Sequence, residues 1–365
     1  MAKRDFYVKD SELDDFQVKV INRRTDNSFI VKGCAGSGKS ILALWKAKQI
    51  QEKNMGSYLY VVYTKALRQY MEDGIREVGL ENNNVCNFDA CFYWKVTETV
   101  DFNGKTKKEY TRGDWKKGTY DYIIVDEAQD FSKEDINLFM SKANKALLLY
   151  GDSAQQLYKF IKNKQTVSME DIHQITGYPE EQLVFNHRLP KKIARVAEKV
   201  ISIKDSLVDR CTEEGEWEPV IMQSGSIDQQ LDTITEIIKN KNLEDVGILF
   251  RNNEEVEYAS RYLTSKGLTV EAKYNNVLSL DFTSDNPKLM TYHSAKGLQF
   301  ANVFVPECST ESADDRNPLY VAITRPYERL FVLYSNHLSS FFDNVPDDAY
   351  VTDWAETSGN AGIFL

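Results

Sequence analysis

The chain has few cysteines and histidines, no long apolar run and no excess of positive charge. Its 365 residues include five cysteines and four histidines. An odd number of cysteines scattered along a long chain is not a disulfide scaffold and fits a reducing cytoplasm. No stretch approaches the ~18 apolar residues of a membrane span, and residues 1–15 carry charges without an apolar core. We therefore expect a cytoplasmic protein with no membrane partner.

The charge balance limits how the chain can bind a polyanion. Lys and Arg number 45 against 55 Asp and Glu, a formal charge of -10. A surface of that sign does not attract nucleic acid indiscriminately, so any such polymer must bind in a local basic groove. Hydrophobic residues at 42% and charged residues at 27% exclude a disordered chain and predict a globular protein.

Short apolar runs alternate with helical patterns, which is typical of parallel α/β sheets. One series of runs begins near residues 29, 58, 122 and 146, and a second near residues 246, 289, 302 and 329. Two series in a chain of this length indicate two domains. We place them at 1–180 and 181–365, with a small insertion at about 82–118. Its part 101–118, DFNGKTKKEYTRGDWKKG, predicts a hairpin or loop.

The sequence GCAGSGKS follows the first apolar run and precedes a helical pattern, as a phosphate-binding loop requires. Its glycines let backbone N–H groups turn toward a phosphate at a helix N-terminus. Lys39 would neutralise the β- and γ-phosphates, and Ser40 would ligate Mg²⁺. A chance glycine-rich turn would lack the flanking strand and helix. The nucleotide contacts expected from this loop are Gly33, Cys34, Ala35, Gly36, Ser37, Gly38, Lys39 and Ser40.

Two acidic residues directly follow the apolar run of DYIIVDEAQD. Asp126 would hold Mg²⁺ together with Ser40, and Glu127 would accept a proton from the water that attacks the γ-phosphate. Alone, such a pair would be interpreted as a favourable charge at a helix N-terminus. Together with the phosphate loop it predicts hydrolysis of ATP, whereas a kinase would have no use for Glu127.

Eight motifs occur in the order typical of one family. They are DDFQVKVI, GCAGSGKS, VVYTKALRQYM, VDEAQD, GDSAQQLY, FNHRLP, LMTYHSAKGLQF and LYVAITRPYERL. Together they resemble the UvrD/Rep/PcrA-like branch of the superfamily 1 helicases from Gln17 to Arg329. The resemblance implies an α/β fold of two tandem RecA-like P-loop NTPase domains, with parallel sheets flanked by helices and ATP in the cleft between them.

The resemblance also assigns roles around the nucleotide. Gln17 would recognise adenine, and Gln155 would sense the γ-phosphate. Arg188 and Arg325, from the second half of the chain, would stabilise the charge of the transition state. Alone, each arginine would be interpreted as a surface ion-pair residue. Gln299 replaces the glutamate with which the family contacts the nucleotide sugar, so altered affinity rather than inactivity is expected.

Further residues are implicated along a groove for the polymer. Those expected to contact nucleic acid are Tyr63, Thr64, Tyr158, Phe160, Arg251, Thr291 and His293. Aromatic rings can stack on any base, so no sequence readout is needed. Burial in the core is the alternative for Tyr63 and Phe160, because large aromatic side chains are mostly buried.

These assignments predict an ATP-dependent translocase or helicase on single-stranded nucleic acid. DNA and a 3′ to 5′ direction are expected by resemblance. The family's large second insertion is missing, since only about 40 residues separate Arg251 from Thr291. The alternative is therefore a nucleotide-gated ATPase subunit that recruits a partner such as a nuclease and unwinds little.

The segment 101–118 is a further candidate for contact with the polymer. Its basic and aromatic residues are Lys105, Lys107, Lys108, Arg112, Lys116 and Lys117, with Phe102, Tyr110 and Trp115. They predict an electrostatic landing site for nucleic acid. A solvated hairpin whose aromatic side chains cover the sheet beneath is the alternative.

Overall fold

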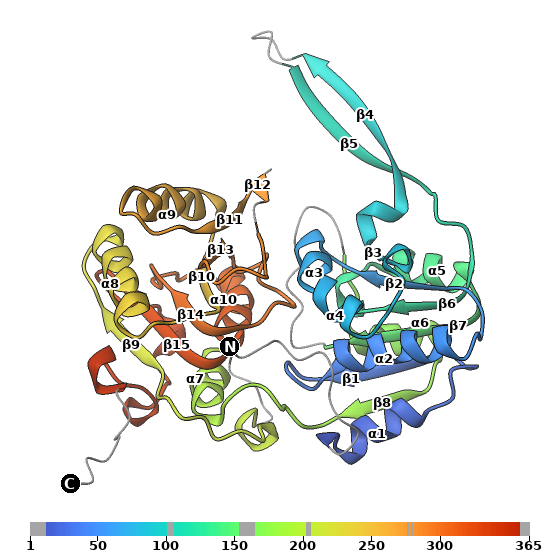
Figure 1. The fold of residues 1–365 in the computed structure, drawn as a ribbon, viewed down its shortest axis with the longest axis horizontal. Helices are drawn as coiled ribbons and strands as arrows, with labels where there is room; N and C mark the ends of the chain where they lie inside the picture. The colour runs from blue at the N-terminus through green and yellow to red at the C-terminus, as the bar shows by residue number, and fades with distance from the viewer. Residues whose placement is uncertain are drawn as a thin grey trace.

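The computed structural model describes residues 12–100, 106–152, 165–201, 206–275, 277–278 and 280–357. Two sheets stand side by side, each flanked by helices (Figure 1). The α/β fold class predicted from the sequence, with two tandem domains whose mainly parallel sheets are flanked by helices, is thereby confirmed. Among the helices in these ranges, none has the length and apolar character needed to cross a membrane.

The first sheet has six parallel strands in the order β3-β2-β6-β7-β1-β8. They are β1 (Phe29–Gly33), β2 (Tyr58–Val62), β3 (Val85–Asn87), β6 (Tyr120–Val125), β7 (Ala143–Gly151) and β8 (Glu180–Leu183). The helices of this domain are α1 (Asp15–Asn22), α2 (Lys39–Glu52), α3 (Lys65–Tyr70), α4 (Glu72–Glu77), α5 (Lys133–Lys142) and α6 (Met169–Thr176). β2 is buried along its whole length, because helices on both faces of a parallel sheet exclude water from apolar central strands.

The second sheet has seven strands in the order β12-β11-β13-β10-β14-β15-β9, and only β12 is antiparallel to its neighbour. They are β9 (Val220–Gln223), β10 (Val246–Phe250), β11 (Glu271–Tyr274), β12 (Val277–Leu278), β13 (Lys288–Thr291), β14 (Phe300–Val305) and β15 (Pro326–Tyr334). Its helices are α7 (Lys191–Ile201), α8 (Ile227–Asn240), α9 (Asn253–Ser265) and α10 (Arg316–Ile323). Both apolar series of the sequence therefore form the expected strands.

The last strand of the first sheet lies at the expected domain boundary. β8 begins at Glu180 and pairs with β1, so residues 180–183 belong to the first sheet. The chain then reaches α7, which packs against α10 of the second domain. We therefore propose that the boundary lies between Leu183 and Lys191, a few residues after the position expected from the sequence.

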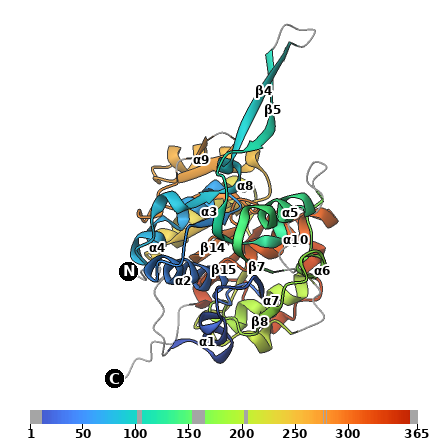
Figure 2. The ribbon, with the colours of Figure 1, turned by 90° about the vertical axis from the view of Figure 1, so that its right-hand side faces the viewer.

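A two-stranded antiparallel hairpin projects from the first domain in both views (Figures 1 and 2). It consists of β4 (Phe92–Val100) and β5 (Thr106–Trp115). The hairpin predicted over 101–118 is thus present but begins earlier, at Phe92. β3 pairs with β2 in the main sheet, so only the part after β3 stands apart from the domain core.

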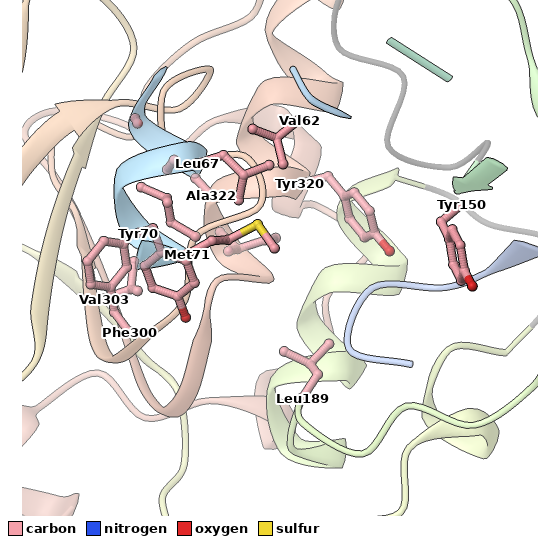
Figure 3. Close-up of a cluster of buried hydrophobic side chains, with 14 of the residues drawn as sticks. Val62, Leu67, Tyr70, Met71, Tyr150, Leu189, Phe300, Val303, Tyr320 and Ala322 are labelled. Carbon is pink, nitrogen blue, oxygen red and sulfur yellow. The ribbon is translucent and has the colours of Figure 1, made fainter. Parts of the chain in front are cut away.

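Apolar side chains from both domains meet in one buried cluster around α3 (Figure 3). Leu67 and Tyr70 of α3 lie near Phe300 and Val303 of β14 in this cluster. The ring of Tyr70 also contacts Phe282, with ring centres 5.3 Å apart. The two domains are therefore joined by hydrophobic burial as well as by polar contacts.

Candidate nucleotide and nucleic-acid sites

The phosphate loop runs from β1 into α2 in the expected conformation. Gly36 and Gly38 adopt φ angles of 75° and 85°, which side chains other than glycine rarely tolerate. A Cβ on Gly36 would lie 2.1 Å from the Asn186 side-chain oxygen, so the loop packs tightly against the FNHRLP segment. The Ser37 hydroxyl is buried and has no hydrogen-bond partner within the described residues. This orphaned donor inside a loop of backbone N–H groups suits an anion.

Lys39 is buried at the start of α2 and points back over the loop. Its Nζ donates to the carbonyl oxygens of Gly33 at 3.0 Å and Cys34 at 2.7 Å. The ammonium group is thus held at the centre of the anion site, as expected for neutralising phosphate charge. Burial raises the pKa of the Cys34 thiol, so this cysteine is a packed neutral group of the loop.

Ser40 and Asp126 meet at the carboxyl end of the first sheet. The Ser40 hydroxyl donates to Asp126 Oδ2 at 2.6 Å, and Tyr60 donates to the same oxygen at 3.3 Å. Burial, with the negative charge of Glu127 beside it, raises the pKa of Asp126 to about 6. A hydroxyl and a carboxylate oxygen are hard donors that fit Mg²⁺, which would itself favour the charged carboxylate.

Glu127 lies in a left-handed backbone conformation, with φ 54°. Such strain typically costs about 1–3 kcal/mol and occurs most often at functional sites. Burial alone would raise the pKa of Glu127. The positive charges of Lys296 and Lys39, with a hydrogen bond from Gln129 Nε2 at 2.6 Å, outweigh burial and lower that pKa. The carboxylate is therefore kept ionised, as a proton acceptor must be.

A buried ion pair crosses from one domain to the other beside Glu127. Lys296 Nζ lies 2.5 Å from Asp130 Oδ1, and both side chains are 2% exposed. Lys296 belongs to the turn between β13 and β14, whereas Asp130 belongs to VDEAQD. The second domain thus places a positive charge next to the candidate base of the first.

Arg188 and Arg325 both lie near Glu127, where the two domains meet. Arg188 Nη2 donates to the Thr324 carbonyl oxygen at 3.0 Å, and Arg325 is buried with hydrogen bonds to the carbonyl oxygens of Val321 and Leu298. Burial, with repulsion from Arg188, lowers the pKa of Arg325 to about 9. Each arginine's charge acts on Glu127, so the structure brings both predicted arginines to the candidate catalytic centre.

Gln17 lies against the phosphate loop. Its Nε2 donates to the Ser37 carbonyl oxygen at 3.2 Å, and a capping box with Asp14 fixes its position at the start of α1. Asp14 also contacts His187 Nε2 at 2.6 Å, so α1 is tied to the segment that carries Arg188. Gln299 is half-buried just before β14.

A second site opens between the domains near the root of the hairpin. It is a cavity of about 290 Å³, lined by Tyr63, Thr64, Lys65, Ala66, Phe88, Asp89, Lys273, His293 and Ser294. Three predicted nucleic-acid residues, Tyr63, Thr64 and His293, therefore come together although they lie in different domains. Burial raises the pKa of Tyr63 and lowers that of His293, so both side chains are kept neutral.

Other predicted contacts lie elsewhere. Thr291 is buried, and its hydroxyl donates to Ser294 within the turn that carries His293, so its role there is to shape the turn. Arg251 is exposed and lies 3.5 Å from Glu255 and 3.9 Å from Asp315. Neither residue lines the 290 Å³ cavity. Gln155, Tyr158 and Phe160 lie outside the described residues.

Two residues of the landing site predicted over 101–118 contact the first domain. Arg112 pairs with the buried Asp135 at 2.8 Å, and its guanidinium lies over the Phe92 ring. Trp115 packs edge-on against Phe92. Arg112 thus pairs with a buried carboxylate, and Trp115 packs on a ring of the core. These two contacts anchor the hairpin to the first domain. Lys108 pairs with Glu98 at 2.9 Å, whereas Phe102 and Lys105 lie outside the described residues.

A larger cavity, of about 950 Å³, lies at the amino ends of β14 and β15 beside α4. Its charged lining residues are Arg76, Lys241 and Arg329, with Glu77, Glu244, Asp245, Asp285 and Glu328. The acidic majority does not suit a polyanion. None of the predicted site residues lines this cavity.

Sequence reasoning missed several residues of the two sites. Gln129 and Asp130 lie in the motif VDEAQD, and Lys296 lies in LMTYHSAKGLQF. Their place inside these motifs is the feature of the sequence that could have identified them. Lys273 of the smaller cavity belongs to no motif, and only the fold shows its place. In the described part of the chain, no three His, Cys, Asp or Glu residues form a group that could hold a metal ion.

Two family models match the chain. A model described as the UvrD-like helicase C-terminal domain matches residues 288–333, and one described as an AAA domain matches residues 17–161. The first lies within the second domain and the second within the first, and both include nucleotide motifs.

Curated relatives match over part of their length. A probable DNA helicase of Mycoplasma pneumoniae is 26% identical over 246 residues, which is 58% of this chain and 43% of that protein. The RecBCD enzyme subunit RecB of Borreliella burgdorferi is 27% identical over 194 residues, 49% of this chain and 16% of that protein. The chain thus spans less than half the length of these relatives.

Solved structures with a similar fold include viral helicases. The helicase of PRRSV is 17% identical with a TM-score of 0.45, covering 91% of this chain and 56% of that one. Arterivirus nonstructural protein 10, a helicase, is 15% identical with a TM-score of 0.43, covering 87% and 61%.

Proposed function

We propose that this chain, which resembles the UvrD-like helicases of superfamily 1, is an ATP-dependent motor on single-stranded nucleic acid. The observation that carries the proposal is the turn between β13 and β14. Its residue His293 lines the cavity between the domains, and three residues later Lys296 pairs with Asp130 beside Glu127. One short segment therefore contacts both the candidate groove for the polymer and the candidate hydrolytic centre.

In the proposed reaction, ATP occupies the phosphate loop between the domains. Lys39 neutralises the β- and γ-phosphates, and Gln17 recognises the base. Glu127 orients a water and accepts its proton, while Arg188 and Arg325 stabilise the charge that spreads over the leaving phosphoryl oxygens. Ser40 and Asp126 would hold Mg²⁺, which supplies further neutralisation of the phosphates. Gln155, as the γ-phosphate sensor, remains part of the proposal.

The polymer is proposed to be a single strand of DNA moving through the groove in the 3′ to 5′ direction. Tyr63, Thr64 and His293 would contact it in the cavity. The further contacts that stay predictions are Arg251, Thr291, Tyr158 and Phe160. Neutral aromatic and imidazole rings suit stacking on bases, and Lys65 and Lys273 on the cavity wall suit phosphates. Closure of the domains on ATP and reopening after hydrolysis would move the strand.

A second candidate is a nucleotide-gated ATPase subunit that recruits a partner such as a nuclease. Two observations favour it. One relative is named a subunit of an enzyme complex, and the described residues between Arg251 and Thr291, where the family carries its large second insertion, form α9 and the short strands β11 and β12. All five cysteines are free thiols, which supports a place in the reducing cytoplasm for either candidate.

The test is the ATPase rate of the full chain alone and with single-stranded DNA, single-stranded RNA or blunt duplex, together with unwinding of a duplex that has a 3′ tail. We expect single-stranded DNA to raise the rate several-fold and the tailed duplex to be unwound. Stimulation without unwinding would favour the subunit function. A rate that no nucleic acid changes would refute both the motor and its polymer.

A further inference from the structure

The β4–β5 hairpin exposes apolar side chains to an unusual degree. Of the eight large hydrophobic side chains that are exposed in the described part of the chain, four lie on this hairpin. They are Tyr93 at 62%, Trp94 at 43%, Val96 at 50% and Tyr110 at 62%. Clusters of exposed apolar surface mark binding sites more often than scattered single residues do.

The hairpin does not need these rings to hold its position. Its root is fixed by the Arg112–Asp135 ion pair, and by Trp115, whose Nε1 donates to the Gly118 carbonyl oxygen at 2.7 Å. Packing of Val96 against Tyr110, which lie directly opposite each other, does stabilise the two-stranded stem. That cross-strand packing leaves both side chains at least half exposed, and it does not involve Tyr93.

The exposed rings adjoin the cavity between the domains. Trp94 Nε1 donates to the Asp89 carbonyl oxygen at 3.0 Å, and Asp89 and Phe88 line that cavity. By the strand register, Trp94, Val96 and Tyr110 share one face of the hairpin. A strand that leaves the cavity past Asp89 therefore meets Trp94 first and the other two side chains beyond it.

The charge of the hairpin favours a polyanion over a protein. Residues 92–117 hold seven basic and four acidic residues in a chain whose formal charge is -10. Six of the seven basic residues are lysines, which are depleted at protein–protein interfaces but common beside phosphates. The Lys116 ammonium lies 5.9 Å from the centre of the Tyr93 ring, so a cation and a stacking surface stand side by side.

We propose that the hairpin is a second nucleic-acid-binding site, whose exposed aromatic rings stack on unpaired bases of the strand beyond the cavity. This inference rests on the proposed function and extends the path of the same polymer. Stacking on Tyr or Trp serves any base, so the site adds affinity and length to the footprint without sequence preference.

The test compares two double variants of the two aromatic rings that share the face next to the cavity. Trp94→Ala with Tyr110→Ala removes both rings, whereas Trp94→Phe with Tyr110→Phe keeps an aromatic ring at each position and serves as the matched control. Binding of oligo(dT) of increasing length is measured by fluorescence anisotropy at fixed salt. Because removing one stacked ring weakens binding by about tenfold, we expect the alanine variant to bind long oligonucleotides about 10- to 100-fold more weakly.

Three further readouts make the outcome specific. Short oligonucleotides that fill only the cavity should bind the alanine and phenylalanine variants alike, and basal ATPase should match the wild type. Independently, Lys95→Gln with Lys116→Gln should lower the log–log salt slope by ~0.7 for each phosphate that these lysines neutralise. Stimulated wild-type ATPase with equal binding of long oligonucleotides by all variants would overturn the inference and leave the motor intact. No binding of any strand by the wild type would overturn the proposed function itself.

Discussion

Glu127 combines a strained backbone with a carboxylate that neighbouring charges keep ionised. We expect Glu127→Gln to retain ATP binding and to lower turnover by ~10²–10⁴, because an amide cannot accept the proton. Lys39→Ala should instead weaken ATP binding, since it removes charge from the phosphate site. Steady-state ATPase and equilibrium binding of a fluorescent ATP analogue separate the two effects. Glu134→Gln, at an exposed position of α5, is the control, and unchanged turnover in Glu127→Gln would refute the assignment.

Lys296 lowers the pKa of Glu127 from the other domain, so its effect is visible in the pH dependence of turnover. In Lys296→Met the pKa of Glu127 rises, and the base takes up a proton at higher pH. We therefore expect the acidic limb of the kcat–pH profile to shift to higher pH. The measurement is kcat at saturating ATP across the acidic to neutral range.

The same substitution leaves Asp130 buried without the Lys296 ammonium, which typically costs about 3–5 kcal/mol of unfolding free energy. Adding Asp130→Asn removes that buried charge and should recover much of the stability, as measured by thermal unfolding. Asp130→Asn also removes a negative charge near Glu127, and that loss lowers the pKa of Glu127, so we expect the double variant to keep only part of the pH shift. An unshifted profile in Lys296→Met alone would refute the electrostatic role of Lys296.

Helix α3 and the turn between β13 and β14 form a close contact between the domains. Gly297 has φ 79°, and a Cβ there would lie 2.9 Å from Leu67 Cδ1. Gly267 has the same φ, but a Cβ there would meet nothing within 4 Å. Gly267→Ala should therefore cost only the backbone strain of ~1–2 kcal/mol. Crowding against Leu67 should lower the unfolding free energy of Gly297→Ala by a further ~1–3 kcal/mol. The measurement is the difference between the unfolding free energies of the two variants.

The Gly297 substitution should also change function, because the turn carries both His293 and Lys296. We expect weaker stimulation of ATPase by single-stranded DNA in Gly297→Ala and wild-type stimulation in Gly267→Ala. Equal stability and stimulation in the two variants would show that α3 tolerates movement of the turn.

At the scale of the whole molecule, Arg188 and Arg325 bring positive charge to Glu127 from the second half of the chain. Arg188→Ala should lower kcat by ~10³–10⁵ with little change in ATP affinity, because the contact strengthens only in the transition state. Arg195 lies on α7 and forms an exposed ion pair with Asp348, so Arg195→Ala should leave both kcat and ATP affinity unchanged. The measurements are kcat and the dissociation constant of ATP. A parallel loss of affinity and kcat would make Arg188 a binding residue for the ground state.

Arg325 differs from Arg188 because its hydrogen bonds to Val321 and Leu298 also support α10 and the start of β14. Its alanine variant should therefore lose both turnover and thermal stability. Comparing the two arginines separates a role in the reaction from a role in the fold.

The amino-acid sequence by itself determined the two α/β domains and the phosphate loop with its acidic partners. These features depend on local patterns: apolar runs that become buried strands, glycines at positive φ, and carboxylates directly after a strand. The nearness of Ser40 and Asp126 followed from the same rule, because parallel strands bring their carboxyl ends to one edge of a sheet.

Only the tertiary structure decided which distant residues meet. Asp130 and Lys296 are 166 positions apart, and their pairing depends on how the domains pack around α3. The ion pair of Arg112 is a second contact that the sequence did not predict. The basic residues around Arg112 predicted an exposed surface for nucleic acid, but in the fold Arg112 pairs with Asp135. Neither contact has a local pattern, because a buried ion pair forms wherever packing removes water from two opposite charges.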